Sequence, residues 1–235
     1  MDSPWVGAEP SVLVFDVNET LIDVESLEPL FEAVFGDRRV MRQWLDQLFL
    51  YSITATLSGQ YEGFFALGQG VLRMVGDIHG VRITDTEAEN LRTGMLTMPA
   101  HPDVAAGLGR LSDAGFRMVT LTNSPANPAG PSPLEHAGLA RFFERRFTVE
   151  TVRAYKPASA TYHLVSRALG VPPGACMMVA AHVWDTIGAQ SAGYTAGLIT
   201  RPGNAPLPVA SLPQPNLVAR DLPDLADQLI RRWRR

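Results

Sequence analysis

An apolar run near the start of the chain ends in an aspartate. The residues Val12–Phe15 are all apolar, and Asp16 follows them directly. This pattern predicts a buried strand that delivers a carboxylate to the carboxyl edge of a sheet, where open α/β folds place their chemistry. A carboxylate at such an edge can act as a nucleophile. The hydroxyl of Thr20, which follows shortly after, is placed to hold Asp16.

The segment 16–20, Asp-Val-Asn-Glu-Thr, resembles the first motif of the haloacid dehalogenase superfamily, which most members write as Asp-x-Asp-x-Thr. In the phosphatases of that superfamily the second aspartate protonates the leaving group. Asn18 stands at this position, and an amide has no titratable proton to donate. Because a halide needs no proton to leave, Asn18 favours the dehalogenase branch and a resemblance to the type II (S)-2-haloacid dehalogenases.

Three later segments resemble the remaining motifs of that family, in the expected order. Residues 119–124 are β-rich and end in hydroxyl and amide groups, as in motif II. The Tyr-Lys-Pro sequence at 155–157, followed by Tyr162, resembles motif III. Residues 177–185 form an apolar run that ends near an acid, as in motif IV. The resemblance therefore covers nearly the whole chain.

The resemblance implies a hydrolysis in two steps. Asp16 would displace the halide from carbon and form an ester, which water then hydrolyses. Lys156 would keep Asp16 ionised, and Asp185, beside Asp16 in space, would orient or deprotonate the water. The expected activity is the conversion of small 2-haloalkanoic acids, such as haloacetates and (S)-2-halopropionate, to 2-hydroxy acids. No cofactor and no metal are expected.

The resemblance also implies a substrate pocket. Thr122 and the backbone amides after Asp16 would bind the substrate carboxylate, while Asn123 and an arginine of the cap would line the departing halide. The arginine maps best to Arg42, with Arg38 and Arg39 close enough to leave the register open. The alternatives are a surface position for Arg42 and a core position for the aromatic residues. The expected substrate-binding residues are Val17, Asn18, Arg42, Phe64, Thr122, Asn123, Tyr162 and Trp184.

His182 departs from the family pattern. The best-known members carry serines and an asparagine where Ala180, Ala181 and His182 stand. An imidazole beside the nucleophile can donate a hydrogen bond or help to activate water near neutral pH. A purely structural histidine is the alternative. We include His182 among the expected catalytic residues, together with Asp16, Thr20, Lys156 and Asp185.

The composition fits a single enzyme and limits the classes of partner that the chain can bind. The chain has 235 residues, of which 46% are hydrophobic and 19% charged, enough for one large core. A net charge of -4 argues against a nucleic-acid partner, which normally requires a basic face. The single cysteine, Cys176, favours a reducing compartment. The sequence shows neither a membrane-spanning apolar run nor a signal-peptide form, so a cytoplasmic location is expected.

The apolar periodicity predicts an α/β fold with an insertion. From about Ser26 to Met98 the pattern is helical with no strand signal, which is where the family places a cap over the site. After it, helices and strands alternate, with strands expected at 116–121 and 147–149 among others, which predicts a parallel, Rossmann-like sheet. We therefore expect a core formed by residues 1–25 and 98–235 and a helical cap formed by 26–97. Homodimers are common among relatives, so a homodimer is possible.

Two other functional classes are compatible with the same motifs. One is a magnesium-dependent phosphatase that uses Asp16 and Asp185 as metal ligands. Asn18 and the single acid of motif IV argue against it. The other is a binding protein that keeps the fold without turnover, since fold does not guarantee function. The presence of Asp16, Lys156 and Asp185 together argues against that.

Overall fold

A six-stranded parallel sheet forms the centre of the molecule in the computed structural model, which describes residues 8–126 and 130–234. The strand order is β3-β2-β1-β4-β5-β6, so the chain starts in the middle and winds outward in both directions. This arrangement confirms the expected Rossmann-like α/β fold. The strands are β1 (Val12–Phe15), β2 (Met118–Thr122), β3 (Arg145–Thr148), β4 (Cys176–Ala180), β5 (Thr195–Ile199) and β6 (Leu217–Ala219).

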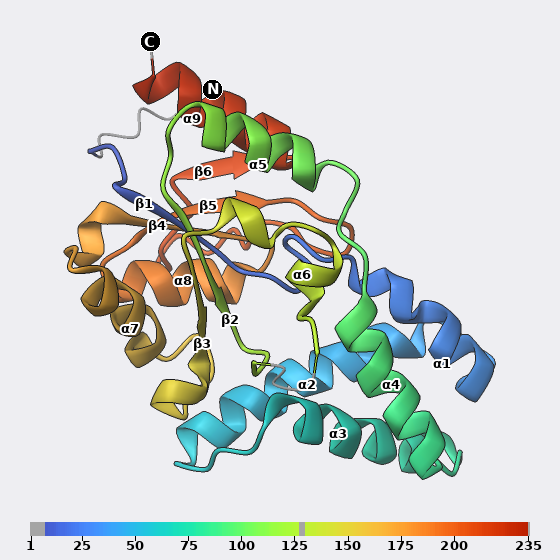
Figure 1. The fold of residues 1–235 in the computed structure, drawn as a ribbon. Coiled ribbons are helices and arrows are strands. Elements are labelled where there is room, and N and C mark those ends of the chain that lie inside the picture. The colour runs from blue at the N-terminus through green and yellow to red at the C-terminus, as the bar shows by residue number, and fades with distance from the viewer. Residues whose placement is uncertain (1–7, 127–129, 235) are drawn as a thin grey trace.

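Helices cover both faces of the sheet (Figure 1). One face carries α5 (Val104–Asp113) and α9 (Leu222–Trp233), and the other carries α7 (Ser159–Leu169) and α8 (Val183–Ser191). The first two helices approach closely, because a Cβ at Gly107 would lie 2.7 Å from the side chain of Leu222. Short elements connect the rest: α6 (Pro133–His136), η2 (Ala140–Phe142), η3 (Val149–Val152) and η4 (Pro173–Ala175).

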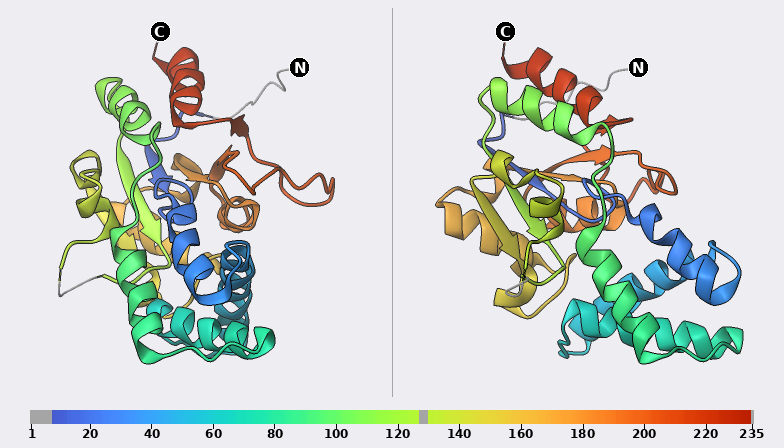
Figure 2. Two further views of the ribbon diagram at one scale, coloured as in Figure 1. Left: turned by 90° about the vertical axis from the view of Figure 1, so that its right-hand side faces the viewer. Right: turned by 45° about the vertical axis from the view of Figure 1, so that its right-hand side comes forward.

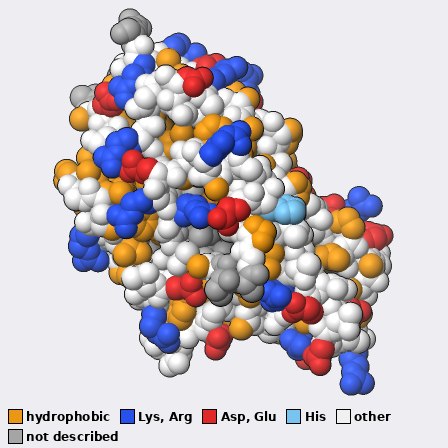
Figure 3. All heavy atoms as spheres, in the orientation of Figure 1, with side chains coloured by type: hydrophobic (Ala, Val, Ile, Leu, Met, Phe, Trp, Pro, Cys, Tyr) orange, Lys and Arg blue, Asp and Glu red, His pale blue; other side chains and the backbone are white. Residues whose placement is uncertain are grey.

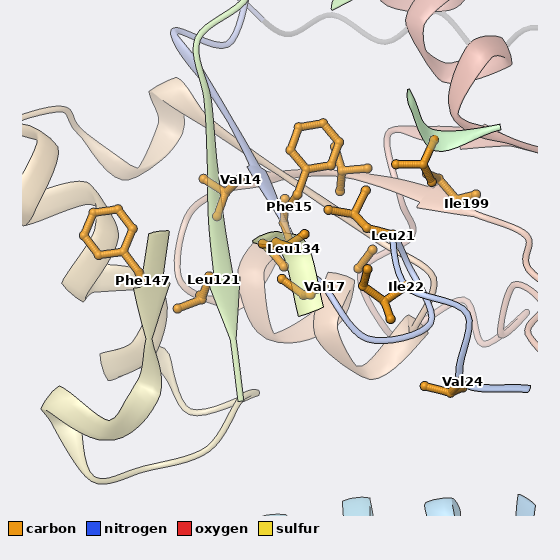
Figure 4. Close-up of a cluster of buried hydrophobic side chains, with 14 of the residues drawn as sticks. Val14, Phe15, Val17, Leu21, Ile22, Val24, Leu121, Leu134, Phe147 and Ile199 are labelled. Atoms are coloured by element: carbon orange, nitrogen blue, oxygen red, sulfur yellow. The ribbon is translucent and has the colours of Figure 1, made fainter. Parts of the chain in front are cut away.

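The central strands are apolar because they are buried on both faces. Every residue of β1 and β4 is buried. Strands of parallel sheets covered by helices read as continuous apolar runs for this reason. Figure 4 shows part of this core, in which Phe15 of β1, and Leu21 and Ile22 of the loop that follows, lie among side chains of other elements. The burial of this segment holds the backbone that leads into Asp16.

Four helices and a short 3-10 turn lie between β1 and α5. They gather at one end of the sheet, at the bottom and right of Figure 1 and along the lower edge of Figure 2. The indole of Trp44 is buried among them and donates to the carbonyl of Gly68 at 2.9 Å. The assignment of 26–97 as a separate cap stays a prediction. The elements between β1 and α5 are η1 (Val24–Leu27), α1 (Glu28–Phe35), α2 (Val40–Leu57), α3 (Phe64–His79) and α4 (Asp85–Thr97).

The surface carries charges of both signs. On the face seen in Figure 3, basic and acidic side chains are interspersed. Several form exposed ion pairs, such as Arg117 with Glu144 at 2.7 Å and Arg110 with Asp227 at 2.9 Å. Within the described ranges, none of the helices has the length and apolar character needed to cross a membrane.

Candidate active site

A lysine joins two carboxylates at the carboxyl edge of the sheet. Asp16 follows β1, and Asp185 lies in the first turn of α8, which follows β4. Lys156 Nζ donates to Asp16 Oδ1 at 2.8 Å, to Asp185 Oδ2 at 2.6 Å and to the carbonyl of Leu121 at 3.1 Å. An ammonium group has three donors, so Lys156 is fully used. All three charged side chains are buried.

This lysine is also unusual in the composition of the chain. Lys156 is the only lysine among the 235 residues, and every other basic side chain besides the histidines is an arginine. A compact ammonium can donate in three directions, whereas a planar guanidinium matches carboxylates in a fork. The Asp16–Lys156–Asp185 arrangement needs the former, because the three acceptors belong to three different residues.

The charges of this cluster keep Asp16 ionised. Burial raises the pKa of Asp16, but the neighbouring Lys156 and His182 outweigh burial and hold this pKa far below its ordinary value. Burial lowers the pKa of Lys156, but the two carboxylates raise it above the ordinary lysine value. Asp16 is thus a carboxylate in a site almost without solvent, as an attacking nucleophile requires.

Thr20 fixes the second oxygen of the nucleophile. Its hydroxyl donates to Asp16 Oδ2 at 2.6 Å and accepts from the backbone N–H of Ala181 at 2.9 Å. The side chain therefore ties the loop after β1 to the end of β4. This position agrees with the one expected for Thr20 from the sequence.

Tyr162 completes the surroundings of Asp185. Its hydroxyl donates to Asp185 Oδ1 at 2.7 Å, so both oxygens of Asp185 accept from protein donors. Burial raises the pKa of Asp185 and outweighs the opposing effect of Lys156.

Gly188 leaves the space in which Pro157 and Tyr162 pack against α8. A Cβ at Gly188, in α8, would lie 2.4 Å from Pro157 Cβ and 2.6 Å from the Tyr162 hydroxyl. We expect Gly188→Ala to lower the free energy of unfolding by about 1–3 kcal/mol through overpacking, and to reduce kcat because Pro157 adjoins Lys156. Denaturant unfolding and steady-state kinetics measure both.

Gly109→Ala is the matched control, because Gly109 is also helical and a Cβ there would meet nothing within 4 Å. This control should keep its activity and gain up to about 1 kcal/mol from helix propensity. Equal stability and activity of the two variants would contradict the close packing around Gly188.

Glu19 is a buried site residue that the sequence interpretation passed over. Its Oε2 lies 2.5 Å from His182 Nε2, and its Oε1 accepts from the guanidinium of Arg42. Its backbone is left-handed, with φ of 61°, which is uncommon for a residue other than glycine. Burial raises the pKa of Glu19, but His182 and Arg42 outweigh it and lower the pKa. The sequence feature that could have identified Glu19 is its position as an acidic residue inside the first motif.

Arg42 reaches from α2 to Glu19, and its guanidinium is already paired. Besides Glu19, its guanidinium contacts Glu25 Oε1 at 3.1 Å and the carbonyl of Pro202 at 3.4 Å. The neighbouring Arg38 and Arg39 instead form exposed ion pairs with acids of their own segment. Among the three arginines considered from the sequence, Arg42 is therefore the one that faces the site.

A cavity of about 350 Å³ lies beside the charged cluster, between α2 and the core. The ring of Phe49 lies 4.9 Å from the ring of His182 and 5.3 Å from that of Trp184. The Trp184 ring also lies 5.8 Å from Lys156 Nζ. Trp184 is thus both a wall of this cavity and a neighbour of the cluster. The cavity is lined by Glu19, Arg42, Asp46, Phe49, His182, Trp184, Gly203 and Asn204.

A second cavity, of about 320 Å³, is lined by other expected residues, including Val17, Asn18 and Thr122. Asn18 Nδ2 donates to Ser124 Oγ at 3.0 Å, and Thr122 Oγ1 accepts from the N–H of Ser124 at 3.1 Å. Of the expected substrate-binding residues, Val17, Asn18 and Thr122 therefore line this cavity, Arg42 and Trp184 line the first, and the other three line neither.

Two expected residues have mainly packing contacts. The side-chain oxygen of Asn123 accepts from the backbone N–H of Lys156 at 3.1 Å and so positions the lysine. Phe64 is buried at the start of α3, and its ring lies 5.9 Å from that of Tyr155. Both contacts join segments that are distant in the sequence.

The fold and this cluster define a class: Rossmann-like hydrolases with an aspartate and a lysine at the sheet edge and a helical insertion after the first strand. A family model of haloacid dehalogenase-like hydrolases matches residues 10–193. The chain belongs to this family.

Individual relatives cover nearly the full chain. An (S)-2-haloacid dehalogenase, H-109 of Pseudomonas putida, is 26% identical over 93% of this chain and 97% of its own length. Haloacetate dehalogenase H-2 of a Moraxella strain is 26% identical over 82% of this chain and 87% of its own. The crystal structure of the L-2-haloacid dehalogenase RSc1362 superposes with a TM-score of 0.87 and 27% identity, covering 94% and 99% of the two chains.

Proposed function

We propose that this chain hydrolyses the carbon–halogen bond of small 2-haloalkanoic acids, such as haloacetates and (S)-2-halopropionate, to give 2-hydroxy acids. The observation that carries the proposal is the buried, ionised Asp16 held by Lys156 at 2.8 Å. The names of the relatives, which are 2-haloacid and haloacetate dehalogenases, support the same substrate class.

In the first step a carboxylate oxygen of Asp16 attacks the carbon that carries the halogen. The new C–O bond forms as the carbon–halogen bond breaks, the centre inverts, and the halide leaves with the bonding electron pair. Lys156 keeps Asp16 charged, and Asp185 and Tyr162 hold Lys156 in place. The product of this step is an ester between Asp16 and the substrate.

The substrate carboxylate needs donors close to Asp16. The hydroxyl of Thr122 and the backbone amides of Val17 and Asn18 are suited to this, since turn amides at a strand end bind anions. Arg42 and Asn123 are proposed to line the departing halide, and Trp184 to contact the substrate carbon chain. Phe64 is proposed to support the pocket indirectly, by packing against the ring of Tyr155.

The alternative functions remain as outcomes of the test. A magnesium-dependent phosphatase is disfavoured by Asn18, whose amide donates to Ser124 and cannot act as an acid. A silent binding protein is disfavoured by the ordered contacts of Lys156 with Asp16 and Asp185. We also propose a cytoplasmic location, since the one cysteine is a buried free thiol. A homodimer is proposed separately, from the resemblance to the family.

Halide release measures the proposed function directly. The substrates are chloro-, bromo- and fluoroacetate and each enantiomer of 2-chloropropionate, with a chelator present. A generic phosphomonoester with magnesium serves as the comparison. We expect chelator-insensitive halide release and no phosphate release. Metal-dependent phosphate release without halide release would establish the phosphatase, and absence of both would favour a binding protein.

A further inference from the structure

The imidazole of His182 has one paired and one unpaired nitrogen. Its Nε2 lies 2.5 Å from Glu19 Oε2. Its Nδ1 lies 3.5 Å from Asp16 Oδ2, an ion-pair distance, and is buried without a hydrogen-bond partner among the described residues. Unpaired polar atoms in a buried site are uncommon and call for an explanation. The unpaired nitrogen points to the nucleophile.

The ring is held in this orientation from several sides. Trp184 stacks on it at 4.9 Å, and Phe49 meets it edge-on at 4.9 Å. Glu19 is itself held by Arg42. When the imidazole is neutral, the carboxylate of Glu19 requires the proton on Nε2, which leaves the lone pair of Nδ1 facing Asp16. Glu19 therefore selects the tautomer in which Nδ1 is a base.

The other candidate base is already occupied. Both oxygens of Asp185 accept hydrogen bonds, one from Lys156 and one from Tyr162. These contacts hold Asp185 against Lys156 and Tyr162 and leave one lone pair on each of its oxygens. His182 Nδ1 accepts no hydrogen bond from the described residues and lies 3.5 Å from Asp16 Oδ2.

Resting on the proposed function, we propose that His182 is the general base that activates water against the Asp16 ester, and that Glu19 is the positioning residue that orients it. Asp185 then serves to hold Lys156. A general base must lie within reach of the proton that it takes, directly or through the reacting water. The 3.5 Å between Nδ1 and Asp16 Oδ2 meets this requirement.

Formation of the ester prepares the base. Burial lowers the pKa of His182, but the carboxylates of Asp16 and Glu19 outweigh it and raise the pKa to about 9, so the resting imidazole is protonated. Esterification removes the charge of Asp16, so the pKa of His182 falls and its proton passes to solvent. The other charged groups around the ring are Arg42 and Asp46 from α2, and Lys156 and Asp185 across Asp16.

The proton balance of the second step closes. Nδ1 takes a proton as the water oxygen bonds to Cγ of Asp16, and the resulting tetrahedral intermediate expels the alkoxide by breaking its bond to Cγ. The alkoxide takes the proton from Nδ1 and leaves as the 2-hydroxy acid. The regenerated acid of Asp16 returns its proton to His182, which restores the resting pair. One proton reaches solvent in each turnover, as the overall reaction requires.

Rapid-quench kinetics with chloroacetate test the proposal, with chloride and glycolate measured separately. In His182→Asn we expect a chloride burst of about one per active site, followed by hydrolysis slowed at least about 100-fold, the usual range for loss of a general base. The ester should accumulate and appear as a mass increase on the peptide that contains Asp16. The burst itself shows that this variant is folded.

Glu19→Gln is the second variant and keeps the size of the side chain. We expect ester hydrolysis to slow about 10-fold or more because the tautomer is no longer fixed. The rising limb of the hydrolysis rate against pH should also move to lower pH, because one carboxylate beside His182 is lost. Glu144→Gln is the matched control, since Glu144 is an exposed carboxylate that pairs with Arg117 and does not line this cavity.

Two results would overturn the assignment. One is ester hydrolysis at the wild-type rate in both variants, and the other is joint loss of burst and turnover with no ester detected. A wild-type enzyme that releases no halide would instead refute the proposed function, so the two failures are distinguishable.

Discussion

Halide release from 2-haloacids is expected to disappear in Asp16→Asn, with kcat reduced about 10⁴-fold or more, as for loss of other covalent nucleophiles. An amide in place of the carboxylate is a poor nucleophile and cannot form the ester. The fold should persist, because Lys156 keeps its contact with Asp185. Sensitive halide detection over hours measures the loss.

The same variant allows a direct check of the cluster. Because Lys156 is the only lysine, ε-13C-lysine labelling gives a single side-chain signal. In Asp16→Asn this signal should still report a charged ammonium at neutral pH, since the Asp185 carboxylate supports it. Asp113→Asn, at the exposed end of α5, is the control for the chemical change and should keep full activity. Retained halide release in Asp16→Asn would exclude Asp16 as the nucleophile.

Lys156→Met is expected to remove both activity and a large part of the stability. Without the ammonium, Asp16 and Asp185 are two buried carboxylates that face each other. Breaking a buried ion pair by removing one partner costs about 3–5 kcal/mol. The pKa of at least one carboxyl should then rise above its value in the unfolded chain, and a protonated Asp16 cannot attack.

Between about pH 7 and pH 5, the stability of this variant should depend more steeply on pH than that of the wild type. In the wild type the folded-state pKa of Asp16 is depressed, so its contribution to stability is present above its unfolded pKa of about 4 and is lost as the pH falls through the folded pKa. In Lys156→Met the folded state binds more protons than the unfolded state, so its stability should rise as the pH falls from about 7 to about 5. Urea unfolding across this range measures the slope. A slope equal to that of the wild type would contradict the charge arrangement.

The central cluster was predictable from the sequence because parallel strands bring distant residues to one edge. Asp16 and Lys156 are separated by 140 positions, yet each follows a segment that ends at the same edge of the sheet. The carboxylate after an apolar run and the lysine in a family-like motif were sufficient to predict that the two side chains lie together. The fold class followed from the same alternation of apolar runs and helical periods.

The bounds of β3 and β2 were less predictable. A strand was expected at 147–149, whereas β3 spans Arg145–Thr148. Arg145 and Arg146 are exposed at the edge of the sheet, and only Phe147 in this strand is apolar and buried. A search for apolar runs therefore does not detect where this strand begins. Similarly, β2 begins at Met118 and ends at Thr122, whereas the apolar pattern predicted a strand over 116–121.

The pairing of Glu19 with His182 could not be predicted. The two residues are 163 positions apart. The first motif leaves the position of Glu19 open, and the family pattern has an asparagine where His182 stands. Arg42 was expected to face a halide because a motif position suggested it, whereas its carboxylate partners depend on packing between α2 and the loop after β1. Such contacts depend on the tertiary arrangement, which local patterns do not encode.

Single-turnover hydrolysis of chloroacetate in H₂¹⁸O, with enzyme in excess, tests the covalent role of Asp16 most directly. Water that attacks the ester at Cγ leaves its oxygen in Asp16, so the label should appear in the peptide containing Asp16 and the glycolate should be unlabelled. Label in the glycolate and none in that peptide would show that water attacks the substrate carbon itself, and would contradict the ester mechanism.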